Sequence, residues 1–254
     1  MNGVRKFKQG AVLTAATIGA ALAAGAAQAQ DKLTLAYNIG ATSDYVFRGI
    51  SQSDSEPAIQ GGVDATYGSF YGGVWASSID FGLDEQAEVD VYGGIKPVVG
   101  PVTLDFGFVY YYYPGLDDSF NGNYVELKAG ASMSPVDKVT VGGAVYWSPE
   151  FTFSNDADGI YTEVNAAYAI NDQMSVSGAV GHQDVDAPGY YFDASDGDST
   201  DAYTTWNIGL VYTLSGVTLD LRYFDTDLEE VTLIGPSGDP ISDNRFAVSL
   251  KLAF

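Results

Sequence analysis

The chain has 254 residues, no cysteine, and 33 acidic against 11 basic residues, which gives a net charge of −22. The lack of cysteine excludes disulfides, thiol catalysis and cysteine-ligated metals. So negative a chain is a poor ligand for nucleic acid, and we expect none among its partners.

Residues 1–29 have the composition of an export signal. Three basic residues lie near the start, an apolar stretch follows, and Ala27-Gln28-Ala29 places small residues at the −3 and −1 positions of a cleavage site. We expect cleavage after Ala29. Residues 30–254 then form one domain with eight basic and 33 acidic residues, a net charge of −25.

Twelve short segments rich in Val, Tyr, Phe and Thr follow, most of them alternating between apolar and polar residues. This pattern is typical of β-strands, in which successive side chains point to opposite faces. The predicted strands are 33–42, 58–67, 70–80, 87–96, 101–112, 123–133, 138–148, 159–170, 174–182, 202–214, 217–225 and 245–254. The third alternates poorly. No run of 18 apolar residues remains after the signal, so a spanning form has to be a closed barrel, because lipid offers backbone groups no hydrogen-bond partners.

Short and long connections alternate between these segments. The short ones are 68–69, 97–100, 134–137, 171–173 and 215–216, and the long ones are 43–57, 81–86, 113–122, 149–158, 183–201 and 226–244. Outer-membrane barrels have this layout, with short periplasmic turns, longer external loops and an even number of strands. The alternative is a soluble sandwich or barrel, but a closed sheet of twelve strands is too wide for its apolar faces to fill. We therefore predict an all-β fold: a closed antiparallel transmembrane β-barrel of about 12 strands in the cell outer membrane, surrounded by lipid.

The last predicted strand carries apolar side chains at every second position: Phe246, Val248, Leu250, Leu252 and Phe254. Its ten residues are the length that a tilted strand needs to cross a bilayer. The segment resembles the closing strand of bacterial outer-membrane barrels, in which the terminal Phe is part of the signal read by the assembly machinery. That resemblance implies the assembly machinery as a partner during insertion.

The segment that follows the first predicted strand reads SDYVFRGISQ, at positions 43–52. It resembles the signature of the TorF family of proteobacterial porins. The likeness continues in Pro57–Gly62, Phe70–Ser77, Tyr112–Gly115, Asn123–Leu127 and Tyr146–Glu150. The resemblance implies an outer-membrane barrel that acts as a porin, with its substrate undefined.

Keeping the apolar faces on lipid places the charged residues of the strands in the lumen, because a charge near the membrane midplane costs roughly 2–4 kcal/mol. The acidic pore-lining candidates are Asp64, Glu88, Asp90, Asp105, Glu126, Glu163 and Asp220. The basic candidates are Arg48, near the mouth, and Lys96, Lys128, Arg222, Arg245 and Lys251. They form either a constriction that sorts solutes by charge or a lattice of cross-strand salt bridges that braces or closes the lumen. The sequence leaves both open.

Most of the acidic residues fall in the longer connections, so the predicted external mouth is negative and should concentrate cations. A weak Ca²⁺ candidate is the cluster Asp193, Asp196, Asp198 and Asp201. Its spacing is not that of an EF-hand, and a solvated acidic loop is the favoured interpretation. We expect no metal and no other cofactor.

Aromatic residues gather near the predicted external ends of the strands: Tyr45, Phe47, Trp75, Tyr110–Tyr113 and Trp147. We interpret them as an interfacial girdle; stacking of a sugar is the alternative.

The sequence thus predicts a porin-like channel for passive diffusion of small polar solutes or ions, with a weak preference for cations. The alternatives are a surface receptor or adhesin, or a barrel hydrolase that uses His182 as its base. His182 shares the parity of Val176 and Val180, which points it outward, and we expect no enzyme. The solute and the oligomeric state do not follow from the sequence.

Overall fold

The computed structural model describes residues 32–83, 87–154, 156–192, 199–228 and 237–254. The predicted signal, residues 1–29, lies outside them. Within these ranges no helix is long and apolar enough to cross a membrane. The helical element of the described chain is one short 3-10 turn, η1 (Asp118–Phe120).

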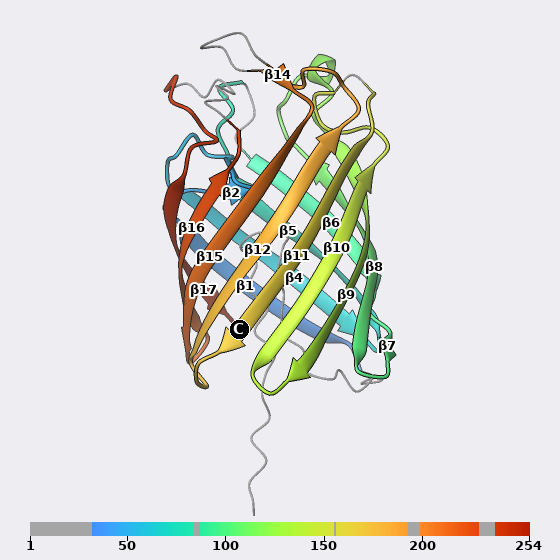
Figure 1. The fold of residues 1–254 in the computed structure, drawn as a ribbon, viewed down its shortest axis with the longest axis vertical. Helices are drawn as coiled ribbons and strands as arrows, with labels where there is room; N and C mark the ends of the chain where they lie inside the picture. Colours follow the sequence, from blue (N-terminus) through green and yellow to red (C-terminus); the bar gives the residue numbers. More distant parts are fainter. Residues whose placement is uncertain (1–31, 84–86, 155, 193–198, 229–236) are drawn as a thin grey trace, which may run out of the picture.

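Twelve antiparallel strands form one closed sheet (Figure 1). They are β1 (Thr34–Thr42), β4 (Ala58–Tyr67), β5 (Phe70–Ser78), β6 (Ala87–Ile95), β8 (Val102–Tyr112), β9 (Tyr124–Val136), β10 (Val139–Ser148), β11 (Gly159–Ala169), β12 (Met174–Val185), β15 (Ala202–Leu214), β16 (Val217–Thr226) and β17 (Arg245–Ala253). The predicted fold is confirmed, and each predicted strand end lies within three residues of the observed one.

The barrel closes where its first and last strands meet. β1 pairs with β4 on one side and with β17 on the other, from Asn38 opposite Ala253 to Thr42 opposite Ser249. Each of the twelve barrel strands therefore has two hydrogen-bonded neighbours, and the barrel sheet presents no free edge to another chain.

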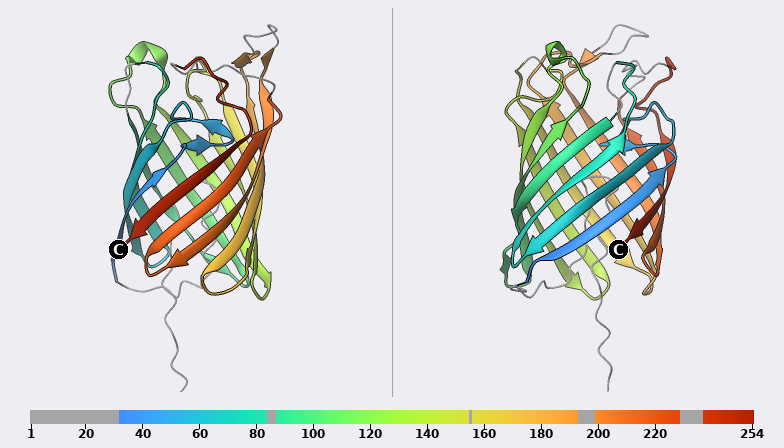
Figure 2. Two further views of the ribbon diagram at one scale, coloured as in Figure 1. Left: turned by 90° about the vertical axis from the view of Figure 1, so that its left-hand side faces the viewer. Right: turned by 180° about the vertical axis from the view of Figure 1, so that it is seen from behind.

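Short turns lie at one end of the barrel and the longer connections at the other (Figure 2). The turn between β15 and β16 is typical: Leu214 pairs with Val217, and Ser215 and Gly216 have φ of 53° and 85°. Two-residue hairpins favour such positive φ because the twist then matches that of the strands. The two-residue strand β7 (Val98–Val99) pairs with the first residues of β8 at this turn end.

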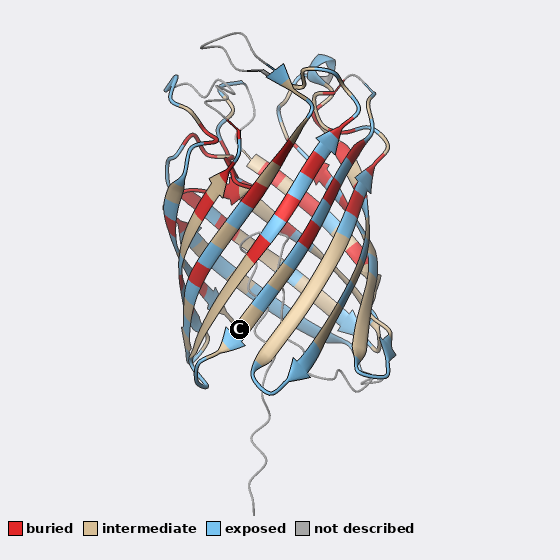
Figure 3. Ribbon diagram, in the orientation of Figure 1, coloured by how far each residue is buried: buried red, intermediate tan, exposed pale blue. Residues whose placement is uncertain are grey.

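Exposed and buried residues alternate along the strands (Figure 3). The exposed positions of the wall are largely apolar, and many of the buried ones are polar or charged. In β4, Ile59 and Val63 are exposed outward, whereas Ala58 and Gln60 are buried inside. β5 is a strand in spite of its weak alternation because its small residues make room for neighbours. A Cβ at Gly73 would lie 2.5 Å from the hydroxyl of Tyr92.

Candidate functional site

The connection between β1 and β4 does not stay outside the barrel. It turns inward and forms the hairpin of β2 (Val46–Phe47) and β3 (Ile50–Ser51), which lies within the ring of strands (Figure 2). Phe47 pairs with Ile50, so Arg48 and Gly49 make a two-residue turn; their φ values of 49° and 86° fit the turn type that such hairpins prefer. We call residues 44–57 the lumenal hairpin.

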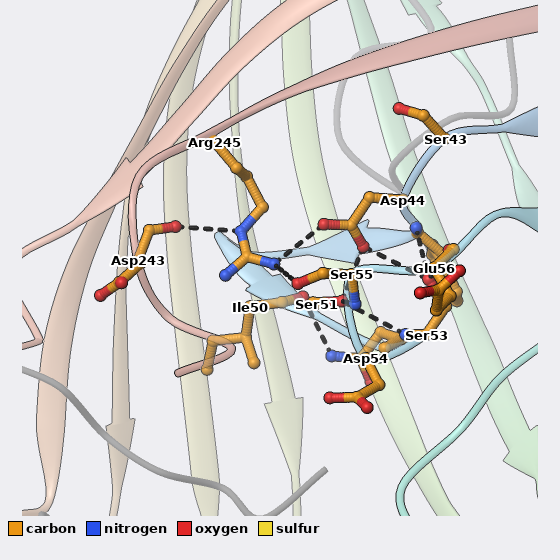
Figure 4. Close-up of polar contacts among 12 residues, drawn as sticks. Ser43, Asp44, Ile50, Ser51, Ser53, Asp54, Ser55, Glu56, Asp243 and Arg245 are labelled. Carbon is orange, nitrogen blue, oxygen red and sulfur yellow. Dashed lines mark hydrogen bonds and ion pairs between the residues drawn. The ribbon is translucent and has the colours of Figure 1, made fainter. Parts of the chain in front are cut away.

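A cluster of hydrogen bonds around Asp44 and Arg245 holds the base of the lumenal hairpin to β17 (Figure 4). Asp44 accepts a hydrogen bond of 2.6 Å from the Ser51 hydroxyl and one of 2.9 Å from Nη1 of Arg245. Arg245 also donates to the hydroxyl of Ser55 at 2.9 Å. Hydrogen bonds with an ionised partner are stronger than those between neutral groups. This cluster therefore fixes where the chain enters the lumen.

The tip of the hairpin reaches the opposite wall through Arg48. Its guanidinium donates two 2.8 Å hydrogen bonds to the carboxylate of Glu126 and a third, also of 2.8 Å, to the amide oxygen of Gln183. Counted around the barrel from β1 through β4, Glu126 lies on the sixth strand and Gln183 on the ninth. Burial alone would lower the pKa of Arg48, but the Glu126 carboxylate raises that pKa above its usual value. Arg48 thus remains a cation with its charge paired.

Other hairpin residues contact further sectors of the wall. The Tyr45 hydroxyl donates to Glu88 on β6 at 2.6 Å, and its ring meets Trp75 on β5 edge to face. Burial, with the neighbouring Glu88, raises the pKa of Tyr45 well above its ordinary value, so the phenol keeps its proton. Gly49 lies so close to β15 and β16 that a Cβ would overlap Thr205 and Thr226. Because it touches strands around most of the ring, the hairpin narrows the bore at this level.

The structure places the strand-borne charged candidates on the inner face, mostly in pairs. Lys128 meets Asp105 at 2.8 Å and Lys96 approaches the same carboxylate at 3.8 Å. Arg222 bonds Asp220 at 3.1 Å, and it also donates to the amide oxygen of Asn207 and the hydroxyl of Ser177. Arg48–Glu126 and Arg245–Asp44 are two further ion pairs. The paired residues thus bring opposite charges together and do not form a ring of charges of one sign.

The remaining candidates are held differently. Hydroxyl or amide groups donate to Asp64, Glu88 and Glu163, and Lys251 is buried on the inner face. Asp90 stands apart: it is 1% exposed, and neither carboxylate oxygen has a hydrogen-bond partner among the described residues. Its cross-strand neighbour Trp75 has an indole N–H without a described partner as well.

The predicted aromatic girdle is only partly right. Tyr110, Tyr112 and Trp147 are exposed on the outer face, as expected. Tyr45, Trp75, Tyr111 and Tyr113 are buried inside the barrel, and Phe47 packs edge to face on Tyr111. Strict alternation through 110–113 would have sent Tyr111 and Tyr113 inward, but no local pattern reveals that the segment with Tyr45 and Phe47 enters the lumen.

A cavity of about 520 Å³ lies at the loop end, beside the lumenal hairpin. Each of the six longer connections contributes to its lining, through Phe47, Phe81, Tyr113, Phe151, Tyr190 and Ile241. Tyr124, Phe153, Tyr191 and Tyr203 bring the number of aromatic residues in the lining to nine. The sequence gives no sign of this cavity, because its walls come from segments distant in the chain.

The structure gives little support to the two other candidates, the histidine and the Ca²⁺ cluster. His182 is exposed on the outer face, with Nδ1 3.2 Å from the hydroxyl of Thr204. Asp193, Asp196 and Asp198 of the Ca²⁺ candidate lie outside the described residues, and the described residues hold no group of three or more His, Asp or Glu side chains suited to a metal ion.

Solved structures share the fold. The NanC porin aligns with a TM-score of 0.57 and 13% identity over 86% of this chain and 99% of its own. The KdgM porin aligns with a TM-score of 0.53 and 9% identity over 87% and 98%. Among curated proteins no match is found. A family model described as "Bacterial protein of unknown function (Gcw_chp)" matches residues 26–254, and the chain belongs to that family.

Proposed function

We propose that this protein is an outer-membrane channel for passive diffusion of small polar solutes or ions, with a bore narrowed by the lumenal hairpin. The observation that carries the proposal is the difference in polarity between the outer and inner faces of the barrel wall. Phe246, Leu250 and their neighbours give the barrel an apolar exterior, while Lys128, Asp105 and other charged groups line its interior. A closed barrel with this polarity suits a lipid exterior and an aqueous lumen.

Three further observations support the proposal. The residues 43–52 resemble the TorF porin signature, and that segment forms the lumenal hairpin. The fold is shared with the NanC and KdgM porins. The predicted export signal at 1–29 and the aromatic residue in the last predicted strand, Phe254, would fit delivery to the outer membrane, with the longer loops outside.

Conductance in planar bilayers tests the channel. Purified protein is expected to give small, stable current steps, because the hairpin narrows the bore. Gly49→Ala should raise the mean step or make it fluctuate, since a Cβ there would overlap Thr205 and Thr226 and displace the hairpin tip. Gly100→Ala is the matched control: Gly100 also has positive φ, but nothing lies within 4 Å of its Cβ position.

No conductance from the wild type, from Gly49→Ala or from a variant without residues 46–51, all of them folded, would contradict the channel. That result would favour the braced, closed barrel, with its loops serving as a receptor or adhesin.

The hydrolase alternative is tested separately, by a substitution of His182. His182→Ala should leave function unchanged, because the ring faces outward and its described partner is the hydroxyl of Thr204.

A further inference from the structure

We propose that the aromatic cavity at the loop end binds an organic cation, that is, a quaternary or protonated amine whose charge is surrounded by apolar groups. The proposal deepens the channel function, on which it rests for its biological meaning: such a cation would be the class of solute that the channel admits. The binding itself can be measured without any conduction.

The cavity has the size and composition of a small-molecule site. Its volume of about 520 Å³ falls in the usual range for such sites, and nine of its lining residues are aromatic. The rings hold one another in place: Phe151 packs edge to face on Tyr124 and Tyr190, and Phe81 does the same on Phe153. A ring held by its neighbours keeps its orientation when a ligand binds.

Two buried carboxyl groups lie behind this aromatic lining. Glu88 accepts a hydrogen bond from Tyr45 and has Tyr113, a lining residue, as a second hydrogen-bonding neighbour. Asp90, two residues along the same strand, is buried without a described partner, and its cross-strand neighbour Tyr111 stacks on the lining residue Tyr124 with ring centroids 4.3 Å apart. Carboxylates removed from water are stabilised by a nearby positive charge.

The basic residue at this site does not meet that need. Arg48 is the cation among the described lining residues, and its two nitrogens are bound to Glu126. Glu126 is paired with Arg48, whereas the lining acid Asp80 and the buried acids Glu88 and Asp90 have no described ion-pair partner. Burial disfavours the ionised forms of Glu88 and Asp90, and a positive guest would stabilise them. A guest that carries positive charge is therefore favoured over an anion or a neutral solute of equal size.

Arg48 itself shows that this chemistry operates in the protein. Its guanidinium lies 4.0 Å from the ring centroid of Tyr161 and 4.7 Å from that of Phe47, with the Glu126 carboxylate beside it. Aromatic faces and a carboxylate together thus hold a cation that has lost its water. The cavity offers the same two elements. Because its lining is largely apolar, a weakly hydrated organic cation fits better than Na⁺, which would have to give up a tightly held water shell.

Calorimetric titration of the full-length barrel in detergent tests the site with a matched pair of probes. Choline carries a quaternary ammonium, and 3,3-dimethylbutan-1-ol has the same shape without the charge. Choline should bind about tenfold more tightly than the alcohol, a difference within the range of a desolvated cation–π contact assisted by charge. Asp90→Asn should lower the choline affinity by about threefold to tenfold and leave the alcohol unaffected. Phe153→Leu, which removes one ring of the lining, should also weaken choline.

Two variants serve as controls for these changes. Phe108→Leu makes the same change on the outer wall, and Asp172→Asn removes a charge at an exposed turn between β11 and β12; both should bind choline as the wild type does. Equal affinity for the two probes, or choline binding that both Asp90→Asn and Phe153→Leu leave intact, would overturn the site. Conductance without choline binding refutes the site but not the channel. Choline binding without conductance refutes the channel but not the site.

Discussion

Arg48 is the residue on which the position of the lumenal hairpin depends most. Its side chain is 6% exposed and that of its partner Glu126 is 2% exposed. If one charge were removed, water could not reach the other to solvate it. Removing one member of a buried ion pair leaves the other uncompensated, at a cost of about 3–5 kcal/mol, whereas removing both is much less costly.

We therefore predict that Arg48→Met destabilises the seated hairpin and that a second change, Glu126→Gln, restores most of the loss. Single-channel recordings should show larger or flickering steps for Arg48→Met, and steps nearer those of the wild type for the double variant. Digestion with a protease added from the loop side gives a second readout, since a displaced hairpin exposes its backbone. Equal step sizes in all three proteins would show that the hairpin is held without this pair.

Single residues also mark the limit of what the sequence could predict. Parity along the strands is enough to predict that Glu126 and Asp105 point inward, because alternation is a local property. It could not pair Arg48 with Glu126 and Gln183, which are 78 and 135 positions away. Those contacts depend on a hairpin whose inward course follows from the closed barrel and not from the local sequence of residues 44–57.

At the scale of one element, β17 completes the barrel. Phe246, Val248, Leu250 and Leu252 are exposed on its outer face, while Ala247 and Lys251 are buried inside. The strand pairs with β16 from Val217 opposite Leu252 to Phe224 opposite Arg245, and with β1 on its other edge. A change on its outer face therefore acts on insertion and closure.

We predict that Leu250→Lys reduces the amount of assembled barrel, measured as the heat-modifiable band in outer-membrane fractions, because a lysine there faces lipid at a cost of roughly 2–4 kcal/mol. Deleting Phe254 should do the same if that residue is part of the assembly signal. Ser249→Lys is the control, since position 249 faces the lumen opposite Asp220. Normal levels for Leu250→Lys and the Phe254 deletion would refute the role given to this strand.

Elements were predictable in proportion to how regular they are. The twelve barrel strands follow from alternation and turn residues, so their bounds were predicted closely. β2 and β3, by contrast, are two residues each and lie in a stretch predicted to be an external loop. Two-residue strands have no periodicity to detect. The cavity beside them was missed for the same reason, since it forms only when six loops converge.

For the whole molecule, the arrangement of charge separates a lumen of mixed charge from an acidic loop end. The described lumenal cations largely meet carboxylates, as in the pairs of Lys128 with Asp105 and Arg222 with Asp220. The chain outside the predicted signal nevertheless carries 33 acidic residues against eight basic ones, and most of the acids lie in the longer connections. The field at the mouth should therefore be negative, while the paired charges along the bore impose little net sign.

From this distribution we predict a weak preference for cations, read as the reversal potential across a salt gradient. Surface charges act over about 8–10 Å at physiological to 0.1 M ionic strength, so the preference should fade as salt rises. Combining Glu56→Gln, Glu150→Gln, Asp156→Asn and Asp186→Asn should reduce it without abolishing conductance. These four side chains are exposed at the loop end.

Exposure makes this set a better choice than acids with structural contacts. Asp225, for example, accepts hydrogen bonds from the Tyr223 hydroxyl and the backbone N–H of Thr226, so its neutralisation would disturb the strand as well as the field. Neutralising Asp137 and Asp172, at turns on the other end of the barrel, is the control and should change the reversal potential less. An anion preference in the wild type would show that lumenal cations such as Lys96, Lys128 and Arg222 govern permeation in spite of their partners. The selectivity would then arise inside the bore, and neutralising the loop acids would leave its sign unchanged.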